Sequence, residues 1–362
     1  MSNTSTLQQA LLHWFSQNQR DLPWRRSYEP YQIWISEIMA QQTQMDRVVA
    51  YFLRWMDLFP DIHTLARAPE DQVLKCWEGL GYYSRARNIT KTAKILLQIH
   101  NAQLPADRKA LLALPGIGPY TAGAIASIAY KQNVPLVDAN VERIFARLFD
   151  INLIPGSLEA KREFWLQAKN ILPEDKARDF NQGLMELGAL ICRPKNPNCS
   201  ACPLSSHCLA LEYSLIPERP VPKKSTKTIP IDMATGVLSH HDMLFIQQRL
   251  ADDVWGSLWE FPGGRMQKGE TPEQTVIREY REETEFEVRI EGKITTTIHH
   301  YTRYKVTLHC FRVSLVGSDC DPVLHAAQDF HWIPAGELSD YAFPAGHRKL
   351  ISFMQKSGLF ID

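Results

Sequence analysis

The spacing of apolar residues changes near residue 213 of the chain. Before that point, apolar side chains recur every three or four positions, which is the period of an amphipathic α-helix. One helical face is shared by Leu7, Leu11, Trp14 and Phe15, and a later one by Ile33, Ile38 and Met45. Further helices are predicted over residues 71–77, 85–100 and 140–149, with Pro, Gly or Asn between them. The N-terminal part is therefore predicted to be all-α.

Beyond residue 213 the pattern becomes one of short strands. Residues 216–230 are rich in proline and lysine and have little apolar periodicity, which favours an exposed linker. Strands are then predicted over residues 231–238, 243–248, 293–298, 305–313 and 330–333, and a single helix from residue 272 to about residue 284. We therefore expect a helical domain over residues 1–213, a linker over 214–230 and an α+β domain over 231–362.

Composition and charge indicate where the protein is located and how it could bind a nucleic acid. The 362 residues are enough for two hydrophobic cores, and no apolar run is long enough to span a membrane. The N-terminus lacks the features of a signal peptide, so we expect a cytoplasmic protein whose seven cysteines are reduced or metal-bound. Forty basic and forty acidic residues give a net charge of zero. Binding to a nucleic acid would therefore depend on local geometry rather than on an overall positive field.

Four of the cysteines are clustered near the end of the predicted helical domain. They are Cys192, Cys199, Cys202 and Cys208, separated by six, two and five residues. Four thiols so close together in a cytosolic protein indicate a metal centre. Zinc sites usually contain two tight Cys-x2-Cys pairs, and this stretch has only one. The spacing fits a cubane iron–sulfur cluster better, while zinc stays open as an alternative.

A glycine-containing turn joins two predicted helices within residues 108–130. Residues 114–126 read LPGIGPYTAGAIA, with Gly116 and Gly118 two positions apart. Glycines allow a sharp turn and close approach of a partner, and the free N–H groups at the start of the next helix favour an anion. A DNA phosphate could bind there without any lysine. The alternative is an ordinary corner between two helices.

The hairpin, the pair Val137-Asp138 and the cysteine spacing together resemble the helix-hairpin-helix DNA glycosylases of the endonuclease III superfamily. The resemblance covers roughly residues 7–212. It implies that the four cysteines ligate a 4Fe–4S cluster.

Two carboxyl groups suit the excision of a base from a nucleotide. Breaking a glycosidic C–N bond needs a protonated leaving base and an anion near the cationic sugar. Glu37 lies in the apolar stretch IWISEIM, where burial would keep it protonated as a general acid. Asp138 precedes a predicted helix, where an N-capping carboxylate would stay ionised. The alternatives are a surface glutamate and a merely capping aspartate.

Within the superfamily, residues 34–44 (WISEIMAQQTQ) resemble the adenine-specific MutY family. The match implies that Glu37 protonates the adenine and Asp138 stabilises the sugar cation. Tyr120 occupies the position where the bifunctional lyase branch carries its Schiff-base lysine, so we expect base removal without strand cleavage.

Four more residues match the family by motif. Gln42 and Tyr82 resemble side chains that the family inserts into the duplex when adenine is flipped out, where a flat group offsets lost stacking. Trp24 and Arg25 resemble parts of the adenine pocket. A core aromatic residue is the alternative for Tyr82. The implied partner is double-stranded DNA with an A:8-oxoguanine or A:G mispair, bound by a monomeric protein that contacts no membrane.

Residues 264–286 resemble the Nudix box. Glu279, Glu282 and Glu283 fall on one side of a predicted helix, where oxygen ligands would favour Mg²⁺ or Mn²⁺. Glu285 replaces the late glycine of the box, which would strain the turn after the helix and puts hydrolysis in doubt.

Two functions are therefore open for the second domain. In the MutY family such a domain usually recognises 8-oxoguanine, and Thr302 lies where a hydroxyl residue contacts the lesion, although Arg303 replaces the usual histidine. The alternative is an added or sole 8-oxo-dGTP pyrophosphatase activity. A protein that only binds DNA or senses redox state would need no buried glutamate.

Overall fold

The computed structural model describes residues 2–222, 227–317 and 320–359. The chain forms two compact units. The helical unit contains Met1–Arg67 and Asn88–Lys224, and the sheet unit contains Ala68–Arg87 and Ser225–Asp362. This division differs from the consecutive segments expected from the sequence, because residues 68–87 pack with residues far along the chain. Of the expected linker, residues 223–226 lie outside the described residues.

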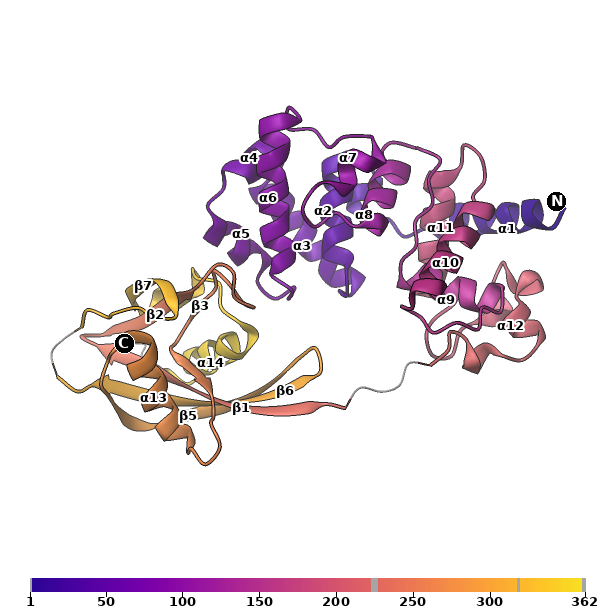
Figure 1. Ribbon diagram of the computed structural model, residues 1–362. Helices are drawn as coiled ribbons and strands as arrows, with labels where there is room; N and C mark the ends of the chain where they lie inside the picture. The colour runs from indigo at the N-terminus through magenta and orange to yellow at the C-terminus, as the bar shows by residue number, and fades with distance from the viewer. Residues whose placement is uncertain (1, 223–226, 318–319, 360–362) are drawn as a thin grey trace. The chain divides into compact units, whose positions relative to one another are not determined.

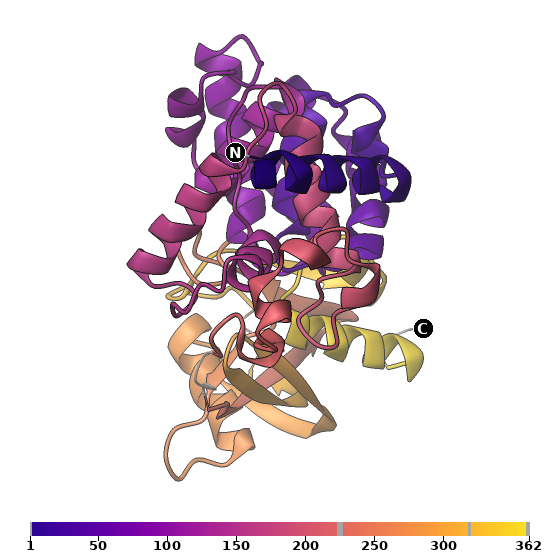
Figure 2. The same ribbon diagram turned by 90° about the vertical axis from the view of Figure 1, so that its right-hand side faces the viewer.

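The helical unit consists of α-helices joined by short turns, as predicted (Figures 1 and 2). Its longer helices are α1 (Ser2–Asn18), α2 (Pro30–Ala40), α3 (Met45–Leu58), α6 (Ser84–Ile99, whose first turn belongs to the sheet unit), α9 (Ala139–Leu148), α10 (Leu158–Asn170) and α11 (Ala177–Leu190). Its shorter helices are α4 (Ile62–Arg67), α7 (Arg108–Leu112), α8 (Pro119–Ala124) and α12 (Leu209–Glu212). Single tighter or wider turns are η1 (Pro23–Arg25), η2 (Ile125–Ala129), η3 (Cys199–Ala201), η4 (Ser205–His207) and η5 (Ile216–Glu218).

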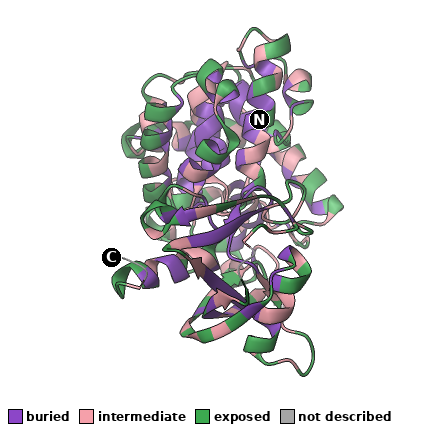
Figure 3. Ribbon diagram, turned by 90° about the vertical axis from the view of Figure 1, so that its left-hand side faces the viewer, coloured by how far each residue is buried: buried purple, intermediate pink, exposed green. Residues whose placement is uncertain are grey.

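Apolar periodicity explains which helix faces are buried. Leu7, Leu11 and Phe15 of α1 are buried on one face, as their spacing predicts. Figure 3 shows buried segments in purple on the helices and strands, and exposed segments in green at many turns and helix ends. The prediction that Met45 continues the face of Ile33 was wrong, because α2 ends at Ala40 and Met45 begins α3. The helices predicted over residues 85–100 and 140–149 are found within one residue as α6 and α9.

The sheet unit contains a mixed sheet, with neighbouring strands in the order β3-β2-β1-β6-β5. The strands are β1 (Ile229–His240), β2 (Met243–Arg249), β3 (Trp259–Glu260), β4 (Gly263–Arg265), β5 (Val288–Tyr301), β6 (Tyr304–Leu315) and β7 (Ala327–Pro334). β1 and β6 are parallel, β5 and β6 form an antiparallel hairpin, β4 pairs with β1, and β7 pairs with β2. The five predicted strands all lie within observed ones. The short strands β3 and β4 were not predicted.

Two helices cover this sheet and make its core. Ala234 and Leu238 of β1 pack in a cluster with α13 (Pro272–Thr284), whereas Val237 packs in a second cluster with α14 (Ala345–Lys356), as alternation along a strand requires. At Gly236 a Cβ atom would lie 2.8 Å from both Tyr280 and Val276, so glycine lets α13 approach β1. The expectation of a single helix in this part was wrong, because α14 follows the last strand.

The sheet unit also contains α5 (Glu70–Trp77), which agrees with the helix predicted over residues 71–77, and the short turn η6 (Ala335–Ser339). In the described part of the chain, no helix has the length and apolar character needed to cross a membrane.

Candidate active site

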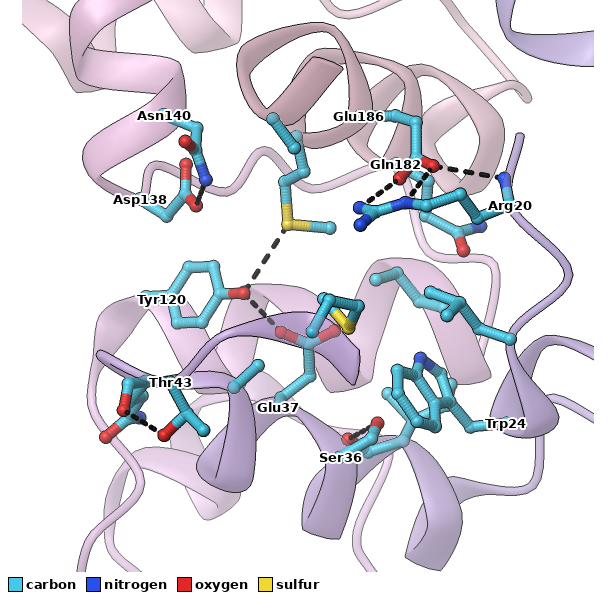
Figure 4. Close-up of a pocket in the computed structure, with 18 of the residues that line it drawn as sticks. Arg20, Trp24, Ser36, Glu37, Thr43, Tyr120, Asp138, Asn140, Gln182 and Glu186 are labelled. Carbon is cyan, nitrogen blue, oxygen red and sulfur yellow. Dashed lines mark hydrogen bonds and ion pairs between the residues drawn. The ribbon is translucent and has the colours of Figure 1, made fainter. Parts of the chain in front are cut away.

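A pocket of about 600 Å³ lies in the helical unit, with walls from η1, α2, α8, α9, α11 and the turn after α2 (Figure 4). Six residues singled out in the sequence line it: Trp24, Arg25, Glu37, Gln42, Tyr120 and Asp138. They come from positions up to 114 residues apart (24 to 138), so the fold brings together groups that the sequence only suggested separately.

Glu37 is a buried acid of this pocket. It is only 8% exposed and lies on α2, where every residue from Ile33 to Met39 is buried. The Tyr120 hydroxyl donates a hydrogen bond to Glu37 Oε2 and lies 3.4 Å from Met185 Sδ (Figure 4). Burial raises the pKa of Glu37 to about 7, against the hydrogen bond from Tyr120, while the negative charge of Asp138 raises it further. Glu37 can therefore carry a proton near neutral pH.

Asp138 caps the first turn of α9 on the same pocket. Its Oδ1 accepts a hydrogen bond from the Val141 backbone N–H at 2.8 Å, and its Oδ2 accepts one from the Asn140 side chain at 2.8 Å. Burial raises the pKa of Asp138, whereas these two hydrogen bonds and Arg143 act in the opposite direction. The carboxylate is thus fixed in direction by two donors, as an N-cap requires.

Another part of the pocket wall is held by an ion-pair network around the buried Glu186, which was not predicted from the sequence. Glu186 accepts hydrogen bonds from Arg20 Nε at 2.6 Å and from Arg25 Nη2 at 3.0 Å. Arg25 Nε also donates a hydrogen bond to Gln182 Oε1 at 3.0 Å. Burial disfavours the charge of Glu186, but the two arginines outweigh it and lower its pKa. Glu186 lies in the apolar stretch GLMELGAL, so the apolar setting that identified Glu37 could also have identified it. Trp24 is buried beside this wall and packs edge-on against Phe52.

The predicted hairpin is formed by α7, the turn and α8. Gly116 has a φ of +76°, and a Cβ atom there would lie 2.7 Å from Asn88 Cβ, so both backbone and space require glycine. Gly118 has an extended backbone and open space beside it. Among the described residues, neither glycine lines the pocket, so the hairpin is a separate surface of the helical unit.

The four clustered cysteines line one small pocket between the end of α11 and α12. Arg147 of α9 donates a hydrogen bond to Cys192 Sγ at 3.3 Å. Burial raises the pKa of the Cys202 thiol to about 11, and the other cysteines raise it further. Four thiolates would therefore be unfavourable here without a cationic group between them, so the residues fit a cysteine-ligated metal centre.

Three carboxylates of the Nudix-like segment form ion pairs with Arg278. Arg278 Nη1 contacts Glu279 at 2.8 Å and Glu282 at 3.0 Å, and its Nε contacts Glu270 at 2.6 Å. Burial raises the pKa of Glu283 to about 8, with the neighbouring Glu260 acting in the same direction. In the parts of the chain that the structure describes, no group of three or more His, Cys, Asp or Glu is arranged to hold a single metal ion.

Three remaining candidate residues have left-handed backbones. Glu285 ends α13 with a φ of +59°, which explains why this position favours glycine. Thr302, in the turn between β5 and β6, has a φ of +51°, which is rare for a β-branched residue. Tyr82 has a φ of +47° and is 41% exposed. Thr302 and Tyr82 both belong to the sheet unit.

Comparison with known families agrees with both units. Residues 35–169 match the model of the HhH-GPD superfamily of base excision DNA repair proteins, and residues 234–353 match the NUDIX domain. Among solved structures, a thermostable thymine-DNA glycosylase is similar with a TM-score of 0.54 and 29% identity, covering 59% of this chain and 98% of that one. These matches support the helical glycosylase fold and the Nudix-like fold expected from the sequence.

Curated relatives extend over more of the chain. Adenine DNA glycosylase of Buchnera aphidicola subsp. Baizongia pistaciae is 37% identical over 261 residues, covering 72% of this chain and 74% of the relative. Adenine DNA glycosylase of Homo sapiens is 30% identical over 408 residues, covering 96% of this chain and 73% of the relative. The chain therefore belongs to the adenine DNA glycosylases, which are enzymes of base excision repair.

Proposed function

We propose that the enzyme hydrolyses the N-glycosidic bond of adenine paired with 8-oxoguanine or guanine in double-stranded DNA, and that it does not cleave the strand. The observation that carries this proposal is the pairing of two carboxyl groups in one pocket, one of which, Glu37, has its pKa raised to about 7. Departure of the base demands a protonated carboxyl group, and formation of a sugar cation demands an ionised one. The hydrogen bonds that Asp138 accepts from Asn140 and Val141 favour its ionised form.

The proposed reaction uses Glu37 first. Its carboxyl proton passes to a ring nitrogen of the flipped adenine, and the electrons of the C1′–N9 bond leave with the base. The sugar becomes an oxocarbenium ion, which the Asp138 carboxylate stabilises, and water then adds at C1′ and releases a proton. The hydrogen bond from Tyr120 occupies Glu37 Oε2, which leaves Oε1 to act on the base.

Tyr120 also accounts for the absence of a lyase step. A strand-cleaving glycosylase needs an amine that attacks C1′, and the phenol at this position has no amine. Burial raises the pKa of Tyr120 well above its usual value, with the charge of Glu37 acting in the same direction, so the phenol is no nucleophile near neutral pH. The product is then an abasic site.

The pKa of Glu37 predicts the pH dependence of base release. A general acid with a pKa of about 7 is protonated below that pH and loses its proton above it. We expect the single-turnover rate of adenine release to be nearly constant below about pH 6, to fall by about half at about pH 7, and to fall toward ten-fold per pH unit above about pH 8. Quenched-flow or manual sampling of A:8-oxoguanine duplexes would measure it, and a rate that rises across this range would exclude Glu37 as the acid.

We assign DNA binding to elements on both units. In the helical unit, the free backbone N–H groups at the start of α8 offer a site for a phosphate of the DNA backbone. Gly118, which precedes α8, leaves space for this phosphate. We propose that the side chains of Gln42 and Tyr82 enter the duplex. Gln42 lines the pocket and has a φ of +58°.

The preference for the base that is paired with the adenine is tested by comparing adenine release from A:8-oxoguanine, A:G and A:T duplexes. Equal rates on all three would contradict it.

We propose that Cys192, Cys199, Cys202 and Cys208 hold a 4Fe–4S cluster. A cubane carries iron at several corners, so its four ligands do not converge on one point as ligands of a single zinc ion do. The cluster would hold the chain between α11 and α12 together, and no step of base removal is assigned to it.

Replacing Cys199 by serine is therefore expected to abolish bound iron and to lower the thermal midpoint of unfolding. The measurement is iron content by colorimetric assay together with the visible absorption of the purified protein. Cys320→Ser serves as the matched control, because Cys320 belongs to the sheet unit and lies far along the chain from the four clustered cysteines. One zinc and no iron in the unaltered protein would contradict the assignment.

For the Nudix-like domain we propose lesion recognition rather than hydrolysis, with Thr302 contacting 8-oxoguanine. The observation that favours this function is that Arg278 already pairs with Glu270, Glu279 and Glu282. If a cation binds there, Mg²⁺ or Mn²⁺ would be held by Glu279, Glu282 and Glu283, and 8-oxo-dGTP hydrolysis is the alternative function.

The expected result is that the purified protein with Mg²⁺ or Mn²⁺ releases no pyrophosphate from 8-oxo-dGTP, because Arg278 already pairs with Glu270, Glu279 and Glu282. Hydrolysis that disappears in Glu282→Gln but persists in Glu287→Gln would overturn lesion recognition as the sole function. Glu287 is a suitable control because it lies on the surface and, among the ion pairs described, pairs only with Arg281.

The cytoplasmic location and the monomeric state expected from the sequence stay predictions.

A further inference from the structure

The loop that carries Tyr82 belongs to the sheet unit. Residues 68–87, between two helical segments of the other unit, pack together with residues 225–362. The segment contains α5, the loop Glu78–Tyr83 and the first turn of α6. The loop is sharply bent, because Gly79, Gly81 and Tyr82 all have positive φ angles. The direction of the exposed Tyr82 ring depends on the contacts that hold this loop.

Glu78, at the start of the loop, is the centre of that support. Its Oε1 accepts hydrogen bonds from the Phe343 backbone N–H at 2.9 Å and from Arg348 at 2.9 Å (Nε) and 2.5 Å (Nη2). Its Oε2 accepts one from Lys75 at 2.9 Å. The side chain of Glu78 is 15% exposed, so these charge-assisted bonds are partly shielded from water. One carboxylate thus joins α5, the loop and the start of α14.

Neighbouring contacts fix both ends of the loop to the Nudix-like domain. Lys75 and Arg348 both donate to the Tyr341 carbonyl, at 3.0 and 2.7 Å. The Tyr83 hydroxyl donates to the Phe343 carbonyl at 3.3 Å, and Arg87 donates to the Gly256 carbonyl at 2.7 Å. Tyr82 therefore lies between residues anchored on both sides.

The loop itself is closed from within. Trp77 Nε1 donates to the Gly81 carbonyl at 3.0 Å, and Arg85 donates to the Leu80 and Gly81 carbonyls at 2.9 and 3.1 Å. The Arg85 guanidinium lies 5.6 Å from the centroid of the Tyr82 ring. Movement of Glu78 would thus be transmitted to the Tyr82 backbone through a short, hydrogen-bonded loop.

We propose that Glu78 is a positioning residue through which the Nudix-like domain sets the direction of Tyr82 for insertion into the duplex. This inference rests on the proposed function, in which Tyr82 enters the DNA and Thr302 contacts the opposite base. Both residues stand on the sheet unit, so recognition of the lesion and insertion of the aromatic ring are carried by one body.

The test is a double-mutant cycle between Glu78 and Tyr82. Glu78→Gln keeps the size of the side chain and removes the charge that binds Arg348 and Lys75. We expect it to lower the single-turnover rate on A:8-oxoguanine by about ten-fold. In the Tyr82→Leu background the same substitution should change the rate by less than about two-fold, because the group that Glu78 positions is gone. A fluorescent base analogue beside the lesion should also report less unstacking in Glu78→Gln than in the unaltered enzyme.

Two outcomes would overturn the inference. One is a full ten-fold loss in the Tyr82→Leu background, and the other is unchanged base unstacking in Glu78→Gln. If Glu78→Gln lowers the thermal midpoint of unfolding by several degrees, Arg348→Lys replaces it in the double-mutant cycle with Tyr82→Leu. Lysine keeps the positive charge at position 348 but cannot contact Glu78 through two nitrogen atoms, as Arg348 does. Arg281→Gln is the control, because its pair with Glu287 lies on the surface of α13. An unaltered enzyme that releases no adenine would contradict the proposed function itself.

Discussion

Replacing Glu37 by glutamine is expected to lower the single-turnover rate of adenine release from A:8-oxoguanine duplexes by about 10³-fold. Glutamine has nearly the same size and still accepts the hydrogen bond from Tyr120, but it has no proton to give to the leaving base. Because Glu37 is buried at an energetic cost to its charged form, the substitution should not lower the stability of the fold. Duplex affinity, measured by gel shift, should change little.

The matched control is Glu159→Gln, which alters an exposed glutamate in the first turn of α10. It should leave both rate and affinity unchanged. A Glu37→Gln protein that excises adenine within ten-fold of the unaltered rate would show that another group protonates the base.

Replacing Asp138 by asparagine is expected to slow base release by about 10²-fold or more, with little loss of DNA binding. The amide keeps an oxygen for the Val141 N–H but cannot offer a negative charge to the sugar cation. Since this charge matters only when the bond is broken, the loss should appear in the rate of chemistry rather than in affinity. Single-turnover rates and titrations with an uncleavable adenine analogue separate the two quantities.

Asp107→Asn is an instructive control for this substitution. Asp107 caps α7 in the same way, accepting the Ala110 N–H at 2.7 Å, but it is exposed and lies outside the pocket. Both variants should lose a similar small amount of stability from a weakened cap. If Asp107→Asn slowed base release as much as Asp138→Asn, the effect of Asp138 would be structural and not electrostatic.

Local patterns predicted those parts of the fold that depend on local forces. The periods of apolar residues located α6, α9, α13 and the long strands, because each element buries one face. The helix α14 was missed, since its sequence is interrupted by polar residues and it follows a segment without a clear N-capping residue. The parallel pairing of β1 with β6 joins residues about 75 positions apart, for example Ile229 and Tyr304, and no local pattern records such a contact.

In the candidate site, too, features that depend on local sequence could be predicted, and features that depend on long-range contacts could not. Glu37 could be identified because an acid in an apolar helix is conspicuous, and Asp138 because a capping aspartate precedes a helix. Arg25 was named as a pocket residue, but its ion pair with Glu186 and that of Arg20 were missed, because these pairs join residues 161 and 166 positions apart. The placement of residues 68–87 on the sheet unit was also beyond the sequence, because it depends on Glu78 meeting Arg348, 270 positions away. Long-range ion pairs thus determine features that periodicity cannot reveal.

The most direct test of the central claim follows both products of one reaction. The purified enzyme is incubated with a labelled A:8-oxoguanine duplex, free adenine is quantified by chromatography, and strand breaks are measured before and after alkali. We predict stoichiometric release of adenine and breaks that appear only after alkali, because in the proposed mechanism Glu37 and Asp138 promote loss of the base and Tyr120 supplies no amine. No release of adenine, or breaks that appear before alkali, would contradict this account.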